Sequence, residues 1–91
     1  MVICETKVIN KTGLHARPAA ELSSLAMQYK SSITIKNLSR NGIEANAKSI
    51  MRVLTLGISQ GMQVAVCADG VDEEQAVHQL IALIDSGFGE V

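Results

Sequence analysis

His15 and Arg17 stand two residues apart in the sequence, between Gly13 and the single proline of the chain, Pro18. Proline is favoured in the first turn of a helix, where its missing N–H removes no hydrogen bond. The unpaired N–H groups at such a helix start, together with the helix dipole, bind anions and above all phosphate. Arg17 adds a planar, permanently charged group that matches phosphate oxygens. The stretch therefore predicts chemistry on a phosphate group.

His15 is the candidate nucleophile of this stretch. A neutral imidazole nitrogen can attack phosphorus. The transferred phosphoryl group would then rest over the helix start, beside Arg17 and the backbone N–H of Ala16. Phosphoryl transfer depends mainly on positioning and on charge stabilisation, and these few residues supply both. The alternative from position alone is a helix-capping histidine beside a solvated arginine.

The elements that must position these residues follow from the hydrophobic pattern. Alternating apolar and β-branched residues predict strands at 2–9, 32–38, 43–46 and 62–68. Apolar residues at helical spacing predict helices from about residue 16 or 17 to 29, at 50–56, and from about residue 72 to 85. This order predicts an α+β fold, with a mostly antiparallel sheet that carries the helices on one face and is solvated on the other.

Short local signals mark the ends of these elements. Arg40, Asn41 and Gly42 predict a hairpin turn, because Asn-Gly tolerates positive φ angles. Ser49 is the predicted N-cap of the second helix, and Gly57 is predicted to end it.

Composition limits the kinds of function. The chain has 91 residues, a net charge of −1 and only two aromatic residues, Tyr29 and Phe88. We expect one domain over 1–91, with an aliphatic core. A basic surface and stacking aromatic residues for nucleic acid are absent from this sequence. Because no apolar run is long enough for a membrane span and no secretion signal is visible, we expect a cytoplasmic protein.

The two cysteines do not have the spacing of a metal site. Strand alternation places Cys4 with Val2 and Val8, which we expect to point inward. Cys67 lies opposite the face of Val64 and Val66 and is expected to point outward. A disulfide between opposite faces of a sheet is excluded by geometry. We expect no metal and no cofactor.

The second predicted helix is too apolar for a fully solvated element. Val53 and Leu56 can face the core, whereas Ile50, Met51 and Leu54 cannot all do so. Exposed Met and Ile side chains near a candidate active site predict a partner-binding surface. The alternative is a short helix with imperfect packing.

Three segments carry a resemblance to one family. The segment 13–20, GLHARPAA, is similar to the active-site signature of HPr, the histidine-containing phosphocarrier of the bacterial sugar phosphotransferase system. The segment 48–57, KSIMRVLTLG, resembles the regulatory-serine helix of this family. The segment 61–68, with the Asp-Gly turn and acidic helix start that follow it, is a third match. The similarity covers essentially the whole chain.

The resemblance implies an HPr-like open-faced β-sandwich, βαββαβα, with four antiparallel strands and three helices. It implies that Nδ1 of His15 accepts a phosphoryl group from enzyme I, whose original donor is phosphoenolpyruvate, and passes it to an enzyme IIA. Arg17 matches the phosphate-stabilising arginine. The chain would be a monomeric carrier and not a complete enzyme. The positions implied in partner binding are Ala20, Ile50, Met51, Arg52, Leu54 and Thr55.

Ser49 matches the regulatory serine of the family, which a dedicated kinase/phosphorylase modifies in some relatives. A helix N-cap also tolerates a phosphate, because the helix dipole stabilises its charge. A plain N-cap serine, typically worth ~1 kcal/mol, is the alternative.

Two further functions remain open. The tail and the stretch around His15 are similar to the nitrogen-related branch, NPr, while the helix at 50–56 is closer to the sugar branch. The chain could also be a binding module that docks to a transcriptional regulator through phosphorylated Ser49.

Overall fold

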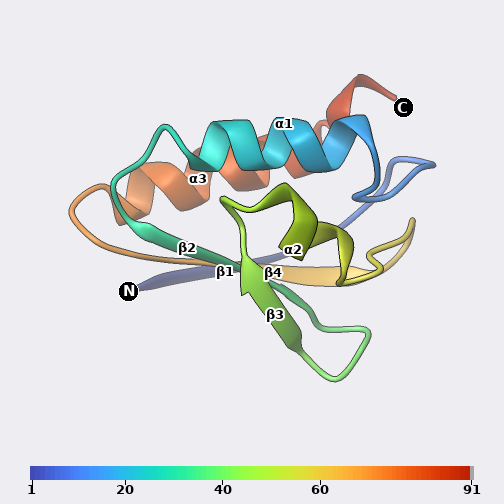
Figure 1. The fold of residues 1–91 in the computed structure, drawn as a ribbon, viewed down its shortest axis with the longest axis horizontal. Coiled ribbons are helices and arrows are strands. Elements are labelled where there is room, and N and C mark those ends of the chain that lie inside the picture. The colour runs from blue at the N-terminus through green and yellow to red at the C-terminus, as the bar shows by residue number, and fades with distance from the viewer. Residues whose placement is uncertain (91) are drawn as a thin grey trace.

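The computed structural model describes residues 1–90 and has four strands and three helices in the predicted order (Figure 1). The elements are β1 (Val2–Lys7), α1 (Arg17–Ala26), β2 (Ser32–Asn37), β3 (Ile43–Asn46), α2 (Ile50–Leu54), β4 (Gln63–Asp69) and α3 (Glu73–Asp85). A short 3-10 turn, η1 (Gly87–Gly89), follows α3. The predicted α+β class is confirmed.

The sheet has the strand order β1-β4-β2-β3, and every pairing is antiparallel. Val66, in the middle of β4, lies opposite Cys4 on one side and Ile35 on the other. Helices α1 and α3 run side by side over one face of the sheet, and α2 packs between α1 and β3 (Figure 1). The predicted placement of the helices on one face is therefore confirmed.

The core lies between this face and the helices, and it is aliphatic with one exception. Val64 and Val66 of β4 pack there with Leu22 of α1 and Leu80 of α3. Phe88 is only 3% exposed and belongs to the same cluster. The expectation of a purely aliphatic core is thus wrong, because the segment after α3 turns back and inserts its aromatic ring. Burying such a ring typically contributes about 1.5–3 kcal/mol.

Cys4 lies on the predicted face of the sheet, but it is not buried in the core. The residue lies opposite Val66, so its side chain is on the helix-covered side of the sheet. It is nevertheless exposed, because β1 is an edge strand. Cys67 is half-buried, and both thiols are free, as expected from their positions on opposite faces.

Two helices are shorter than predicted for the same reason. After α1, the amides of Gln28 and Tyr29 bond to carbonyls three residues earlier instead of four. After α2, the amide of Leu56 bonds in the same way to the carbonyl of Val53. Both helices therefore end in a tightened turn, which hydrophobic spacing does not distinguish from an α-helical turn.

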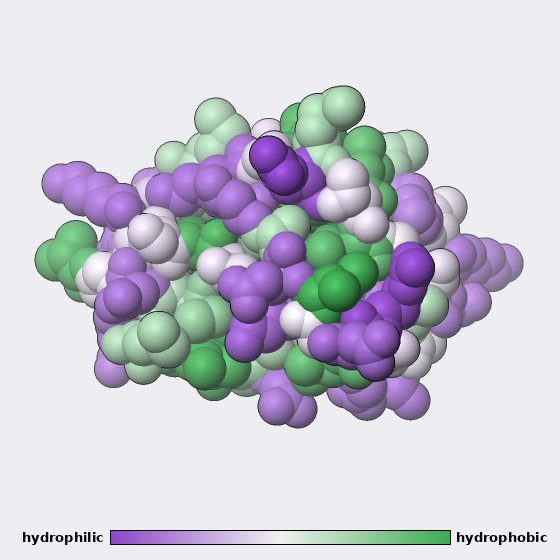
Figure 2. Space-filling model, turned by 60° about the horizontal axis from the view of Figure 1, so that its bottom comes forward, coloured by the Kyte–Doolittle hydropathy of each residue, from purple (hydrophilic) through white to green (hydrophobic). Residues whose placement is uncertain are grey.

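The other face of the sheet is largely solvated, as the alternation predicts. Ile3 of β1, on this face, is 54% exposed. Lys36 and Glu44 form an ion pair of 3.9 Å across β2 and β3. Figure 2, which turns the β3 side of the molecule toward the viewer, shows hydrophobic patches interrupted by hydrophilic side chains. Among residues 1–90, we find no helix with the length and apolar character needed to cross a bilayer.

Candidate functional site

His15 is exposed between two anchored segments. Before it, Leu14 is fully buried, and its amide donates to the carbonyl of Ile58 at 3.0 Å. After it, Ala19 of α1 is fully buried. Gly13 has a φ of 64°, and a Cβ there would lie 2.4 Å from the Ile58 carbonyl oxygen. The glycine therefore allows the loop to press against the segment after α2 while His15 remains accessible.

The start of α1 has the unpaired amides expected of an anion site. Ala16 is the N-cap residue, with φ 51° and ψ −122°, and no side chain caps the helix. Pro18 lies in the first turn, where it has no N–H to satisfy. Within residues 1–90, the N–H groups of Ala16 and Arg17 donate no hydrogen bond. These amides and the positive end of the helix dipole lie directly after His15.

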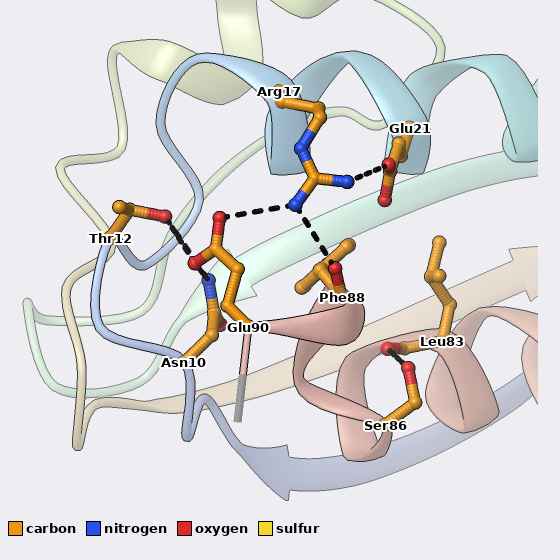
Figure 3. Close-up of polar contacts among 8 residues, drawn as sticks. All are labelled: Asn10, Thr12, Arg17, Glu21, Leu83, Ser86, Phe88 and Glu90. Carbon is orange, nitrogen blue, oxygen red and sulfur yellow. Dashed lines mark hydrogen bonds and ion pairs between the residues drawn. The ribbon is translucent and has the colours of Figure 1, made fainter.

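Arg17 is exposed but already has partners (Figure 3). Its Nη1 donates to Glu21 Oε1 at 2.8 Å, one helical turn along α1. Its Nη2 donates to the Phe88 carbonyl at 3.3 Å and faces Glu90 Oε2 at 3.5 Å. The sequence predicted Arg17 beside His15, but it did not predict these partners from the segment after α3.

Glu90 also reaches the loop before His15. Its Oε1 accepts hydrogen bonds from the Thr12 hydroxyl at 2.7 Å and from Asn10 Nδ2 at 3.1 Å. Asn10 is fully buried, and the same Nδ2 donates to the Gly13 carbonyl at 2.8 Å. The hydrogen bonds from Thr12 and Asn10, with the nearby charge of Arg17, lower the pKa of the Glu90 carboxyl. Its carboxylate is therefore charged at neutral pH.

Ser49 is the N-cap of α2, as predicted. Its Oγ accepts a hydrogen bond from the amide of Arg52 at 3.3 Å. An open groove of about 840 Å³ lies beside it, and Lys30, Lys48 and Arg52 are among its lining residues. Ser49 therefore shares an open groove with three basic residues and with the acidic Glu44.

The exposed apolar surface on α2 is confirmed. Val53 is fully buried and Leu56 is 2% exposed, whereas Ile50, Met51 and Leu54 are 42%, 75% and 36% exposed. The remaining positions of the predicted surface on and beside α2, Arg52 and Thr55, are exposed as well.

Ala20, on α1, is half-buried. It lines a shallow groove of about 410 Å³ between α1 and α3, together with Arg17 and Leu83. Within residues 1–90, no group of three or more His, Cys, Asp or Glu residues is placed to hold a metal ion.

The fold and the site define a class of small α+β protein that presents an exposed histidine directly before the unpaired amides of a helix start, together with a second helix whose apolar side chains are exposed. The family model for the PTS HPr component phosphorylation site matches residues 3–86. The chain therefore belongs to the PTS-HPr family, and it is a phosphocarrier of the phosphotransferase system.

Three similar proteins illustrate this assignment. The phosphocarrier protein HPr of Cupriavidus necator is 45% identical over 86 residues, which are 94% of this chain and 93% of that protein. The phosphocarrier protein NPr of Proteus mirabilis is 41% identical over 81 residues, which are 89% and 88% of the two chains. The crystal structure of HPr from Thermoanaerobacter tengcongensis superposes with a TM-score of 0.93 at 44% identity, covering 100% of this chain and 99% of that one.

Proposed function

We propose that His15 is the phosphoryl acceptor and donor of this phosphocarrier, with Arg17 and the amide of Ala16 stabilising the bound group. The observation that carries the proposal is the exposed imidazole directly before unpartnered amides at the start of α1. A phosphoryl group on the ring would lie next to N–H donors that have no other acceptor.

The transfer conserves atoms and charge. A neutral nitrogen of His15 attacks phosphorus of the donor's phosphohistidine, and the new N–P bond forms as the donor's N–P bond breaks. The electron pair of the broken bond stays on the donor nitrogen, so that only the phosphoryl group moves. The same step in reverse delivers it to the next histidine. The chain alone completes no turnover, so we assign it a carrier role and not an enzyme activity.

Its partners are components of the phosphotransferase system. We propose enzyme I as donor and an enzyme IIA as acceptor, and a monomeric chain acting in the cytoplasm. The exposed side chains Ile50, Met51 and Leu54 support docking beside the histidine loop, since the segment after α2 holds that loop through Ile58. Arg52, Thr55 and Ala20 complete the proposed contact residues.

Ser49 supports a second, regulatory role. The groove beside it contains Lys30, Lys48 and Arg52, which would balance the charge of a phosphate. We propose that a serine kinase/phosphorylase modifies Ser49, and that the modified chain docks to a transcriptional regulator. The chain is similar to both HPr and NPr proteins. We assign it first to the sugar branch of the phosphotransferase system, and the nitrogen branch is the alternative.

Incubation with enzyme I and phosphoenolpyruvate tests the main proposal. We expect one acid-labile phosphate per chain, measured by intact-mass spectrometry. His15→Ala should abolish the labelling, and His78→Ala, which removes the other exposed histidine, should leave it intact. Labelling that persists in His15→Ala would refute the assignment.

A further inference from the structure

Arg40 lies in the turn between β2 and β3, and its side chain folds back against the end of α2. A Cβ added at Gly57 would lie 2.3 Å from Arg40 Nη1, so the guanidinium group occupies space that only a glycine leaves open. The Gly57 amide donates to the carbonyl of Leu54, the last residue of α2, at 3.4 Å. Arg40 is therefore placed at the C-terminal end of this helix, where backbone carbonyls favour a positive charge.

A buried side chain fixes the turn of Arg40 relative to α2. Asn37, at the base of the turn, is fully buried. Its Nδ2 donates to the Leu56 carbonyl at 2.9 Å, and its own carbonyl accepts from the Arg40 amide at 3.1 Å. Because one buried residue binds both segments, the position of Arg40 beside α2 is set before any partner arrives.

The charge of Arg40 has no counterpart within the described chain. Arg40 is exposed and forms no ion pair within residues 1–90. The acidic residue nearest to it in the sequence, Glu44, is paired with Lys36 at 3.9 Å. A guanidinium group carries five N–H donors in a planar fork that matches a carboxylate. Arg40 is therefore available to an anionic group from outside the chain.

Exposed apolar side chains lie on both elements next to Arg40. Ile43 of β3, whose amide donates to the Arg40 carbonyl at 3.3 Å, is 41% exposed. It lies opposite the buried Asn37, on the helix-covered side of the sheet, and α2 packs against β3 (Figure 1). Leu54 of α2 is 36% exposed. The apolar surface of α2 thus continues onto β3 with an arginine at its edge, a composition typical of protein interfaces.

We propose that Arg40 extends the docking surface of α2 and forms an ion pair with a carboxylate of enzyme I. The proposal rests on the docking role proposed above for Ile50, Met51 and Leu54. A small anion would use the guanidinium group alone and leave the apolar side chains exposed. A protein surface that carries an aspartate or glutamate beside an apolar patch covers both, so a protein partner is the occupant that fits.

Charge variants of Arg40 test the contact. Arg40→Gln removes the charge, and Arg40→Glu reverses it. Lys7→Gln and Lys7→Glu are the matched controls, because they change the net charge equally. Lys7 is exposed on the solvated face of β1, at the opposite edge of the sheet from β3, and forms no ion pair within residues 1–90. Thermal unfolding of each variant checks that the fold is retained.

The readout is the affinity for enzyme I, measured by calorimetric titration at about 0.05 and about 0.5 M salt. At low salt, we expect Arg40→Gln to weaken binding about two- to fivefold, the range of an exposed ion pair, and Arg40→Glu about tenfold. High salt should remove most of these differences, because it screens exposed charges. The Lys7 variants should bind like the unmodified chain, and Met51→Asp should weaken binding at both salt concentrations, since it disrupts an apolar contact.

Four results would overturn the proposal, and they differ in what else they remove. Equal weakening by the Arg40 and Lys7 variants would show that net charge acts without a local contact. An effect of Arg40→Gln that persists at high salt would assign Arg40 a packing role instead of an ion pair. Unchanged affinity in both Arg40 variants, with weak binding by Met51→Asp, would refute the extension onto Arg40 alone. Unchanged affinity in Met51→Asp would refute docking on α2, and the contact of Arg40 with it.

Discussion

The carboxylate of Asp72, at the N-cap of α3, accepts hydrogen bonds from the backbone amides of Lys30 and Ser31, at 2.8 and 3.0 Å. The Ser31 hydroxyl donates to it as well. The hydrogen bonds of this one side chain therefore connect the N-terminus of α3 to the two residues just before β2. The hydrogen bond from the Ser31 hydroxyl, followed by the Lys30 amide, lowers the pKa of the carboxyl from 3.8 to about 2.

The first prediction concerns acid stability. Because the folded pKa of Asp72 lies below its ordinary value of 3.8, its contribution is fully present above that pH and is lost as pH falls toward about 2. Asp72→Asn should lower the free energy of unfolding at neutral pH and flatten its decline in this window. Urea titrations at a series of pH values measure both effects. Some decline should remain, since the pKa values of Glu73 and Glu90 are lowered too.

Glu74→Gln is the control for this prediction, because Glu74 is an exposed carboxylate on the same helix. A decline in Asp72→Asn as steep as that of the unmodified chain would contradict the role given to the carboxylate.

The second prediction concerns the strained residue after the histidine. Ala16 has a φ of 51° and a ψ of −122°, a conformation that favours glycine and typically costs about 1–3 kcal/mol for other residues. Ala16→Gly should raise the free energy of unfolding by about 1 kcal/mol, after allowing for the greater freedom of glycine in the unfolded chain.

Ala20→Gly provides the opposite case, since Ala20 lies within α1. The same substitution there should lower stability by about 0.5–1 kcal/mol. Thermal unfolding of both variants measures these two changes in stability. A loss of stability in Ala16→Gly would show that the backbone of Ala16 is not strained.

The third prediction concerns docking. Met51 is 75% exposed on α2, so a charge there is tolerated by the fold but not by an apolar partner surface. Met51→Asp should weaken binding to enzyme I about tenfold, with little change in thermal stability. Calorimetric titration gives the affinity. Met27→Asp is the matched control, because Met27 is 65% exposed just beyond the other end of α1. Equal weakening by both variants would argue against α2 as the contact.

The fourth prediction separates the two roles of Ser49. Its Oγ accepts from the Arg52 amide, and loss of such a cap typically costs about 1 kcal/mol. Ser49→Ala should therefore destabilise the chain by that amount, while Ser49→Asp, which can still cap the helix, should not. Chemical unfolding measures the difference. If the alanine variant is as stable as the unmodified chain, the cap contributes nothing and only the regulatory role is left.

Features that depend on neighbours in sequence were predictable. Pro18 marked the start of α1, and Val53 and Leu56 were correctly assigned to the core. The Asn41-Gly42 turn has positive φ at both residues, as its composition demands. The pair Arg17–Glu21 was not predicted, although its spacing of four residues on a helix was readable.

Features that depend on distant parts of the chain were not predictable from local pattern. Glu90 contacts Thr12 across 78 residues, and Asp72 contacts Lys30 across 42. Hydrophobic periodicity carries no information about such polar partners. Exposure of Cys4 likewise depends on β1 being an edge strand, which only the strand order reveals.

The strand order has a consequence for how the chain is made. β4 sits between β1 and β2, yet its residues, Gln63–Asp69, follow both of those strands in the sequence. While the nascent chain emerges from the ribosome, the β1–β4 and β2–β4 pairings cannot form until β4 has been synthesised. The sheet therefore closes late in synthesis, and until then the unfinished chain offers unpaired strand edges to chaperones and proteases.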